Sequence, residues 1–142
     1  MKTSESKYAM CLYFATNALA RKTEKLAQAC WSKVGLTPSH AYLLMLVNER
    51  PGLQPTVIAA ELQLSPSTVT RLIAKLEDKK LVVRITEGKI TNVYSSPKGK
   101  ALTPRLQLCQ EEFYLRTLGL LGKERSEELV KTVGRAADQI GG

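Results

Sequence analysis

The apolar residues in the first part of the chain recur in alternating steps of three and four positions, the spacing of one face of an α-helix. This pattern predicts one long helix over about residues 5–34, ended by Gly35 in the position of a C-terminal cap. Two lysines interrupt the apolar row, so a small monomer cannot bury it completely, and we expect this helix to pack against another subunit as well. The row consists of Tyr8, Leu12, Ala15, Leu19, Lys22, Leu26, Ala29 and Lys33.

The next segment predicts a buried helix. Thr37 supplies a capping hydroxyl, and Pro38 is favourable in the first turn of a helix. Residues 41–47 are apolar around nearly the whole circumference, so this helix is expected at the centre of the fold. The pair Pro51 and Gly52 ends it.

Two short helices joined by a tight turn are predicted next, which is the helix-turn-helix arrangement. Pro55 opens the first of them, and the turn after it contains Leu64, which we expect to point inward. Ser65 caps and Pro66 opens the second helix, which extends to about Lys79.

The second of these helices has two chemically distinct sides at about 100° per residue. The polar side carries hydroxyl, guanidinium and ammonium groups with one small residue, and these suit a helix in a DNA major groove. An ordinary amphipathic helix with a solvated outer face has the same pattern, but the capped helix before it favours DNA. The apolar side consists of Val69, Leu72, Ile73 and Leu76, and the polar side of Ser67, Thr70, Arg71, Ala74 and Lys75.

A β-hairpin and further helices are predicted after this point. The β-rich runs 82–86 and 90–94 flank a turn around Gly88, so they form a wing directly after the second helix. Helix restarts at Ser96 and Pro97, and we expect Pro104 to kink it. Gly122 then breaks it before a last amphipathic helix. That last helix covers residues 124–140, with Leu129, Val133, Ala137 and Ile140 expected to face inward.

The composition agrees with a single globular domain that is mainly α with a small β-hairpin wing (α+β). The chain has 142 residues, of which 44% are hydrophobic and 24% charged. One histidine, His40, excludes any site that needs two, so we expect no metal, no cofactor and no enzyme activity. Three widely spaced cysteines without a CxxC pair argue against disulfides and zinc, which favours a cytoplasmic location.

The charge distribution predicts an anionic partner. Lys and Arg number 21 against 13 Asp and Glu, a formal net charge of +8. Residues 1–53 and residues 54–100 each carry an excess of four positive charges, whereas residues 101–142 are neutral with six groups of each sign. One end of the molecule is therefore expected to face a nucleic acid or a membrane surface.

The order of elements resembles that of the MarR family of bacterial transcriptional regulators. The most specific match is the segment 58–77, IAAELQLSPSTVTRLIAKLE, preceded by Leu36-Thr37-Pro38. The pair Leu81-Val82 and the segment 95–99, SSPKG, continue the likeness, which covers about residues 8–121.

The resemblance implies a winged helix-turn-helix over residues 36–100 of a single domain spanning 1–142, with dimerisation helices at 5–34 and 101–142. Each subunit of a homodimer would place its second helix in a major groove of a pseudo-palindromic operator, acting most simply as a repressor. Double-stranded DNA and a second copy are the expected partners, and a membrane is not. The positions that match the family's DNA contacts are Ser65, Ser67, Thr68, Thr70, Arg71 and Lys75.

The sequence departs from the family pattern at two places. The usual wing is longer and has an Asp-x-Arg element, which is missing here, so Lys89 or Arg84 would substitute by contacting phosphate. Lys80 stands where a glycine is customary before the Leu-Val pair, so the preceding helix needs another way to end.

Family members respond to a signal, and two kinds are compatible with this sequence. Cys11 lies near the start of the first helix, as in the thiol-sensing branch of the family, where a thiolate reacts with an oxidant. Cys11 is equally compatible with a core position, and Cys30 is roughly 28 Å from it at about 1.5 Å per residue, too far for a disulfide. Alternatively, a small aromatic effector would enter a pocket lined by Tyr13, Phe14, Trp31, His40, Tyr42 and Phe113. Packing in the core explains each of these residues equally well.

A different class of function remains open at this point. The winged helix could serve protein–protein contacts alone, in which case DNA binding would be weak and without sequence preference. Substitution of Arg71 would then have little effect.

Overall fold

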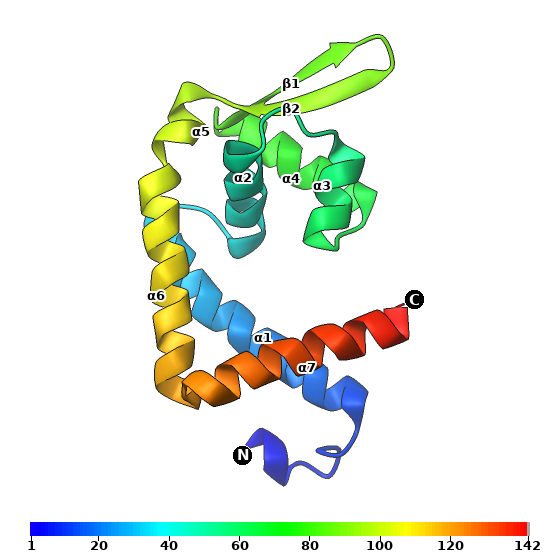
Figure 1. Cartoon of the computed structure of the whole chain (residues 1–142), viewed down its shortest axis with the longest axis vertical. Helices are drawn as coiled ribbons and strands as arrows, with labels where there is room; N and C mark the ends of the chain where they lie inside the picture. The colour runs from blue at the N-terminus through cyan, green and yellow to red at the C-terminus, as the bar shows by residue number, and fades with distance from the viewer. Residues whose placement is uncertain (142) are drawn as a thin grey trace.

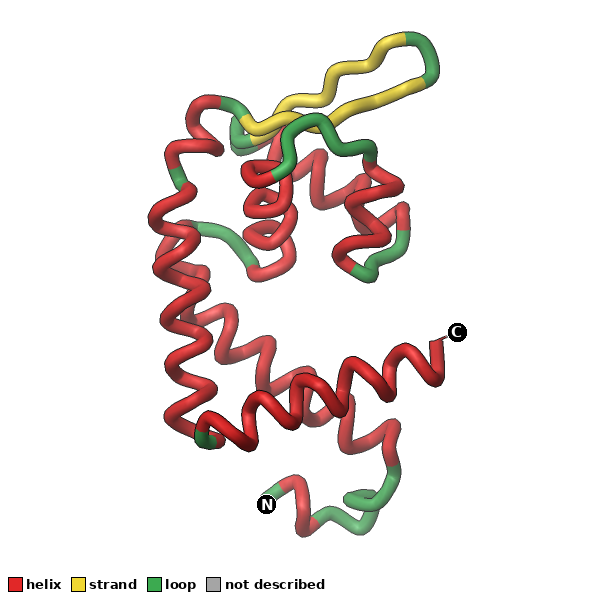
Figure 2. The backbone as a smooth tube through the Cα atoms, viewed as in Figure 1, coloured by secondary structure: helices red, strands yellow, loops and turns green. Residues whose placement is uncertain are grey.

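Two groups of helices make up the molecule, as the computed structural model shows for residues 1–141 (Figure 1). One group surrounds the hairpin and consists of α2 (Pro38–Glu49), α3 (Pro55–Leu62), α4 (Pro66–Asp78), β1 (Val82–Glu87), β2 (Ile90–Ser95) and α5 (Pro97–Ala101). The other consists of α1 (Leu12–Trp31), α6 (Thr103–Leu121) and α7 (Lys123–Gly141), with the 3-10 turns η1 (Thr3–Glu5) and η2 (Ser32–Val34). Figure 2 shows a helical backbone with one antiparallel hairpin, so the predicted fold class is confirmed. No helix of this part of the chain is long and apolar enough to cross a membrane.

Helix α2 lies at the centre of the hairpin-containing group, as its sequence predicts. The Thr37 hydroxyl accepts a hydrogen bond from the backbone N–H of His40 and caps the helix. Leu43, Leu44 and Val47 are fully buried. Helices α1, α3, α4 and α6 and strand β2 all pack against α2.

The helix-turn-helix forms where it is predicted. The Ser65 hydroxyl accepts a hydrogen bond from the N–H of Thr68 at the start of α4, and Pro66 occupies the first turn. Between the helices, Gln63 adopts a left-handed backbone with φ 54°, and the N–H of Leu64 donates to the carbonyl of Ala59. The chain therefore reverses within three residues and brings α3 against α4.

The wing is a hairpin with a two-residue turn. Glu87 pairs with Ile90, and Gly88 occupies the turn with φ 63°, a conformation that glycine adopts without strain. A single bridge between Leu53 and Val93 attaches the hairpin to the loop before α3. Each strand is one residue longer than predicted.

The N-terminal prediction is wrong in its start. Helix α1 begins at Leu12, not near residue 5, because the Ser6 hydroxyl accepts a hydrogen bond from the N–H of Tyr8 and favours a turn there. The residues before Cys11 fold back, and the Lys22 ammonium donates to the Thr3 hydroxyl at 2.9 Å. The first position of the expected apolar row therefore lies outside the helix.

The helix after the wing is interrupted, not kinked. α5 ends at Ala101, Leu102 lies between the two helices, and α6 starts at Thr103, which places Pro104 in the first turn of a new helix. A proline is tolerated in a first turn because no intrahelical partner is needed for the missing N–H. The interruption separates the hairpin-containing group from the long arm formed by α6.

The apolar residues of α7 do not face inward within one chain. Leu129 is half-buried, but Val133 is 46% exposed and Ile140 is 72% exposed. Figures 1 and 2 show why, since α7 turns away from α6 at Gly122 and runs past α1 toward the C-terminus. The expected inward packing of this row is therefore wrong for the single chain.

Lys80 occupies the left-handed conformation that glycine usually supplies, with φ 62°. Its N–H donates to the carbonyl of Glu77, and its own carbonyl accepts a hydrogen bond from the Ser96 hydroxyl at 2.6 Å. These two hydrogen bonds stabilise Lys80 in its strained conformation. Helix α4 can therefore end there without the glycine that is customary at this position.

Gly99 is predicted to be essential to the close packing of α5. A Cβ at this position would overlap the carbonyl oxygen of Leu81, a backbone atom that cannot move aside. We expect Gly99→Ala to lower the free energy of unfolding by about 1–3 kcal/mol, measured by urea denaturation. Gly119→Ala is the control, because a Cβ there meets open space and should stabilise α6 by about 0.5–1 kcal/mol. Equal stabilities of the two variants would contradict the packing argument.

Candidate nucleic-acid interface

The two faces of α4 are separated by burial as the sequence predicts. The apolar residues Val69, Leu72, Ile73 and Leu76 are all buried against the rest of the winged helix. The opposite residues are all exposed, namely Ser67, Thr70, Arg71, Ala74 and Lys75. A convex helical face with these groups has the shape and chemistry of an element that enters a DNA major groove.

Hydroxyl groups gather at the N-terminal end of α4. Ser65 Oγ lies 2.8 Å from Thr68 Oγ1 and 3.3 Å from Ser67 Oγ. Arg71 Nη2 donates to Thr68 Oγ1 at 3.4 Å, so the guanidinium leans toward this end of the helix. Ser65 thus caps the helix and Thr68 orients Arg71, whose remaining N–H groups are available to a ligand.

Exposed lysines extend the positive surface beyond the C-terminal end of α4. Lys79 and Lys80 follow the helix, and the Lys98 ammonium on α5 donates to the carbonyl of Lys79 at 3.3 Å. The sequence pattern did not single out Lys79 and Lys98 as site residues, because their proximity to α4 depends on how α5 folds back. The excess of charge over residues 54–100 was the only signal of them.

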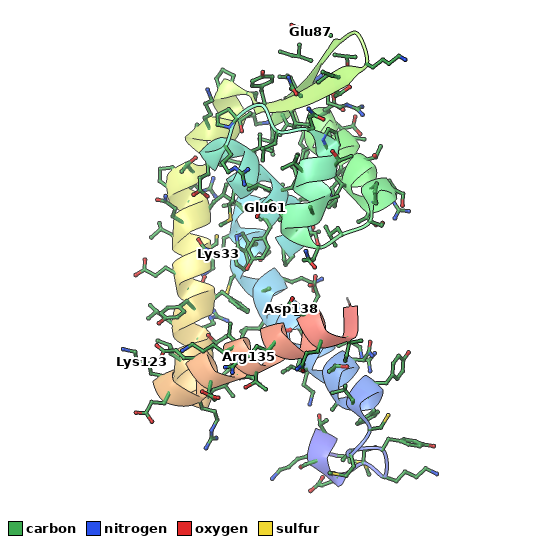
Figure 3. All side chains as sticks on the ribbon, turned by 45° about the vertical axis from the view of Figure 1, so that its right-hand side comes forward. Lys33, Glu61, Glu87, Lys123, Arg135 and Asp138 are labelled. Carbon is green, nitrogen blue, oxygen red and sulfur yellow. The ribbon has the colours of Figure 1, made fainter. Side chains whose placement is uncertain are left out.

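The two candidate residues of the wing differ in position. Lys89 lies in the exposed turn of the hairpin next to Glu87, which Figure 3 shows at the tip. Arg84 lies within β1, away from the turn, and its Nη2 is 2.7 Å from Glu77 Oε1 near the end of α4. Arg84 is therefore ion-paired to α4 and 39% exposed, whereas Lys89 forms no ion pair with residues of the described chain.

His40 is an electrostatic neighbour of α4. Its Nδ1 lies 2.6 Å from Thr37 Oγ1, and the ring is half-buried at the start of α2. Burial lowers the pKa of His40 below its usual value of 6.5, and the positive charges of Lys79 and Lys75 lower it further. His40 is therefore neutral at neutral pH.

The aromatic residues expected to line one effector pocket form two separate groups. Trp31 is fully buried, with ring centroids 5.3 Å from Tyr42 and 5.8 Å from Phe113. Phe14 contacts Tyr8 at 6.1 Å instead, and Tyr13 is 79% exposed near the start of α1. The Nε1–H of Trp31 is buried without a hydrogen-bond partner among the described residues, which is costly for a donor.

The three cysteines have different environments. Cys11 is exposed at the N-cap of α1, so it is not the core residue that its apolar neighbours in sequence suggested. Cys30 and Cys109 are buried, and burial raises the pKa of both thiols, with the Glu112 carboxylate adding to the effect. Residues 1–141 contain no group of three or more His, Cys, Asp or Glu side chains that could hold a metal ion.

The sequence model of the MarR family matches residues 34–89. Among curated protein sequences, none matches the chain. Three solved structures share the fold. The repressor CouR bound to p-coumaroyl-CoA is 23% identical, with a TM-score of 0.83 over 96% of this chain and 98% of that one. CouR bound to a 23-mer DNA duplex has the same identity and coverage and a TM-score of 0.82. The S. aureus MepR–DNA complex is 18% identical, with a TM-score of 0.79 over 92% of this chain and 98% of that one.

The lowered pKa of His40 predicts a pH-dependent stability. An unfolded chain binds a proton at this histidine near pH 6.5, whereas the folded protein binds it only at lower pH. Stability is therefore expected to fall as the pH decreases below about 6.5. Because His40 is the only histidine, its ring signals in NMR give the folded pKa directly.

Lys79→Gln should raise that pKa, and Lys123→Gln, at the distant corner between α6 and α7 (Figure 3), should leave it unchanged. A His40 that titrates at or above its usual value would contradict the proposed environment.

Proposed function

We propose that the chain, whose residues 34–89 match the sequence model of the MarR family, is a transcriptional regulator of that family that binds a pseudo-palindromic DNA operator as a homodimer. The observation that carries this proposal is the outer face of α4. The residues of its inner side, Val69, Leu72, Ile73 and Leu76, are all buried, while Ser67, Thr70, Arg71 and Lys75 are exposed on one convex surface. The family is one of transcriptional regulators, which agrees with the prediction that the chain is not an enzyme.

The proposed complex places α4 in the major groove. Arg71 is the residue for base recognition, because a guanidinium can donate two hydrogen bonds to O6 and N7 of guanine. Lys75 and the hydroxyl of Ser67 on the same face would contact phosphates or base edges. Lys89 at the tip of the wing would reach the backbone, and Lys98 would neutralise phosphates beside the C-terminal end of α4.

The proposed dimer covers apolar surface that one chain leaves exposed. A groove of about 480 Å³ between α1 and α7 is lined mainly by aliphatic side chains, among them Leu19, Val130 and Val133. Leu12 and Ile140 are also exposed, at 58% and 72%. A monomer with so much uncovered apolar area on two helices would associate, and a second copy of these helices is the occupant that the family resemblance implies. Residues 101–142 carry six groups of each sign, so α7 adds little net charge to the contact.

Release from DNA is proposed to follow a chemical signal. Cys11 is exposed at the start of α1, where a hydroperoxide would oxidise its thiolate to a sulfenic acid. The hydroperoxide transfers one oxygen atom to the sulfur and is itself reduced to the alcohol. A small ligand is the alternative signal, since the related fold of CouR is found with p-coumaroyl-CoA. The aromatic group around Trp31 is the place we propose for such a ligand, because its buried indole N–H lacks a partner among the described residues. We propose repression in the cytoplasm as the simplest mode of action.

The proposal is tested by titrating the reduced protein onto fluorescent DNA from upstream of its own gene and onto a shuffled duplex at the same salt concentration. A preference of about 10³ or more for the upstream DNA is expected of a specific regulator. Equal weak binding to every duplex, including a genomic library, would instead favour an interaction module that does not read DNA.

Arg71→Ala is predicted to weaken operator binding by about 1–3 kcal/mol and to relax the preference at one base pair of each half-site. The reason is the loss of a paired contact to a base edge. Arg125→Ala on α7 removes an equal charge away from α4 and should cost much less. Equal losses on every DNA sequence would reassign Arg71 to a phosphate contact.

Val133→Glu is predicted to shift the protein toward monomers, because it places a charge in the apolar groove between α1 and α7. Sedimentation velocity at several concentrations measures the change. Gln139→Glu on the same helix adds the same charge and should leave the oligomeric state unchanged. If Val133→Glu sediments as the unmodified protein does, the dimer uses another surface.

Cys11→Ser is predicted to keep full affinity for DNA while abolishing release by an organic hydroperoxide. The buried Cys30 should not substitute, because its raised pKa keeps it as the unreactive thiol. The same anisotropy titration before and after peroxide treatment gives the result. A Cys11→Ser protein that is still released by peroxide would place the sensor elsewhere.

A further inference from the structure

A cavity of about 350 Å³ lies between α2 and α6, near the junction of the winged helix and the long arm. Met45 and Leu106 give it an apolar floor, and the side chains of Glu49, Gln107 and Gln110 supply polar groups at its wall. Its volume is within the range of small-molecule sites, which begins at about 300 Å³. No residue of the aromatic group around Trp31 lines it, so it is a separate place in the fold.

The charge of this cavity is opposite to that of the molecule. The chain carries a net charge of +8, yet no lysine, arginine or histidine lines the cavity, and the Glu49 carboxylate is its one charged group. Glu49 forms no ion pair within residues 1–141, in contrast to Glu61, Glu77 and Glu112, which are all paired with basic side chains. An exposed carboxylate beside an apolar floor attracts a cation and repels an anion.

We propose that this cavity binds a small organic cation, an ammonium group carried on an apolar body. The Glu49 carboxylate would pair with the ammonium, and the apolar body would lie on Met45 and Leu106. The side-chain carbonyl oxygens of Gln107 and Gln110 accept further N–H groups, since an amide offers an acceptor as well as donors. An anionic compound of the same shape would be excluded, because the cavity offers no positive group to it.

The cavity adjoins a polar junction through which it would act on DNA binding, a step that rests on the proposed function. Asn48 lines the cavity, and its Nδ2 donates to the carbonyl of Gly99 and to Thr103 Oγ1, each at 3.1 Å. Its Oδ1 accepts from the hydroxyl of Ser95 at the end of β2. One side chain thus ties α2 to the wing, to α5 and to the arm. A cation wedged between α2 and α6 shifts this junction and with it the angle of α4 to the arm, which lowers operator affinity.

The experiment compares two probes of nearly identical shape and opposite charge, 2-phenylethylammonium and 3-phenylpropionate. Their binding to the full-length protein is measured by isothermal titration calorimetry, with NMR to locate perturbed residues. We expect the ammonium to bind, with shifts at Asn48 and Gln107, and the carboxylate not to bind there. Glu49→Gln should weaken the ammonium at least about tenfold, the order expected for loss of one charge-assisted contact.

Two variants make the result decisive. Glu127→Gln removes an exposed carboxylate on α7, away from the cavity, and should leave ammonium binding unchanged. Glu49→Lys should reverse the preference in favour of 3-phenylpropionate. The proposal is overturned if the ammonium fails to bind at millimolar concentration, if both probes bind equally, or if Glu49→Gln binds as well as the unmodified protein.

The operator titration separates this proposal from the proposed function. If the protein binds its operator and the ammonium does not bind, the cavity proposal fails and the regulator stands. Ammonium binding that depends on Glu49 in a protein without DNA preference would leave the site intact and overturn the regulator. Operator affinity that falls with ammonium in the unmodified protein, but not in Glu49→Gln, supports both.

Discussion

The structure depends on the need to bury the apolar residues of α2, among them Leu43, Leu44 and Val47. Its residues are apolar around nearly the whole helix, so exposure of any face would be costly, and burial of a leucine or valine side chain is worth about 1.5–3 kcal/mol. The apolar arc of α4 covers one side, and the end of α1 with α6 covers another. Because α4 uses its whole apolar arc for this contact, its polar face must point outward. The surface proposed to face DNA is therefore a consequence of core packing.

The wing and the arm are attached by polar contacts as well as by apolar residues that reach the core, Val82 and Val93 from the hairpin and Leu106 and Cys109 from α6. Glu77 pairs with Arg84 across the end of α4 and β1, and Asn48 ties the end of β2 to α5 and α6. Halfway along the arm, Lys33 pairs with Glu112, and Figure 3 shows Lys33 on the side facing α6. A few hydrogen bonds and ion pairs adjust more readily than a packed core. Signals that alter the geometry of DNA binding are thus expected to act at these junctions.

The caps and the amphipathic pattern of α4 could be predicted from the sequence, and most of the candidate site follows from them. Ser65 and Thr37 cap helices because the hydroxyl and the bonded N–H are three residues apart, a purely local relation. The burial of Val69 and Leu76 follows from helical periodicity in the same way. Exposure of Arg71 and Lys75 then needs no further information, since they lie on the opposite side.

Tertiary structure alone decided the features that depend on distant segments. Arg84 is ion-paired because α4 ends beside β1, and Trp31 meets Phe113 because α1 packs against α6. The start of α1 at Leu12 and the break at Leu102 were missed, because in each case turn hydrogen bonds or a proline competed with a helical pattern. Sequence determined which residues form each helix face. Folding decided which faces meet, because contacts between residues far apart in the chain leave no periodic trace in it.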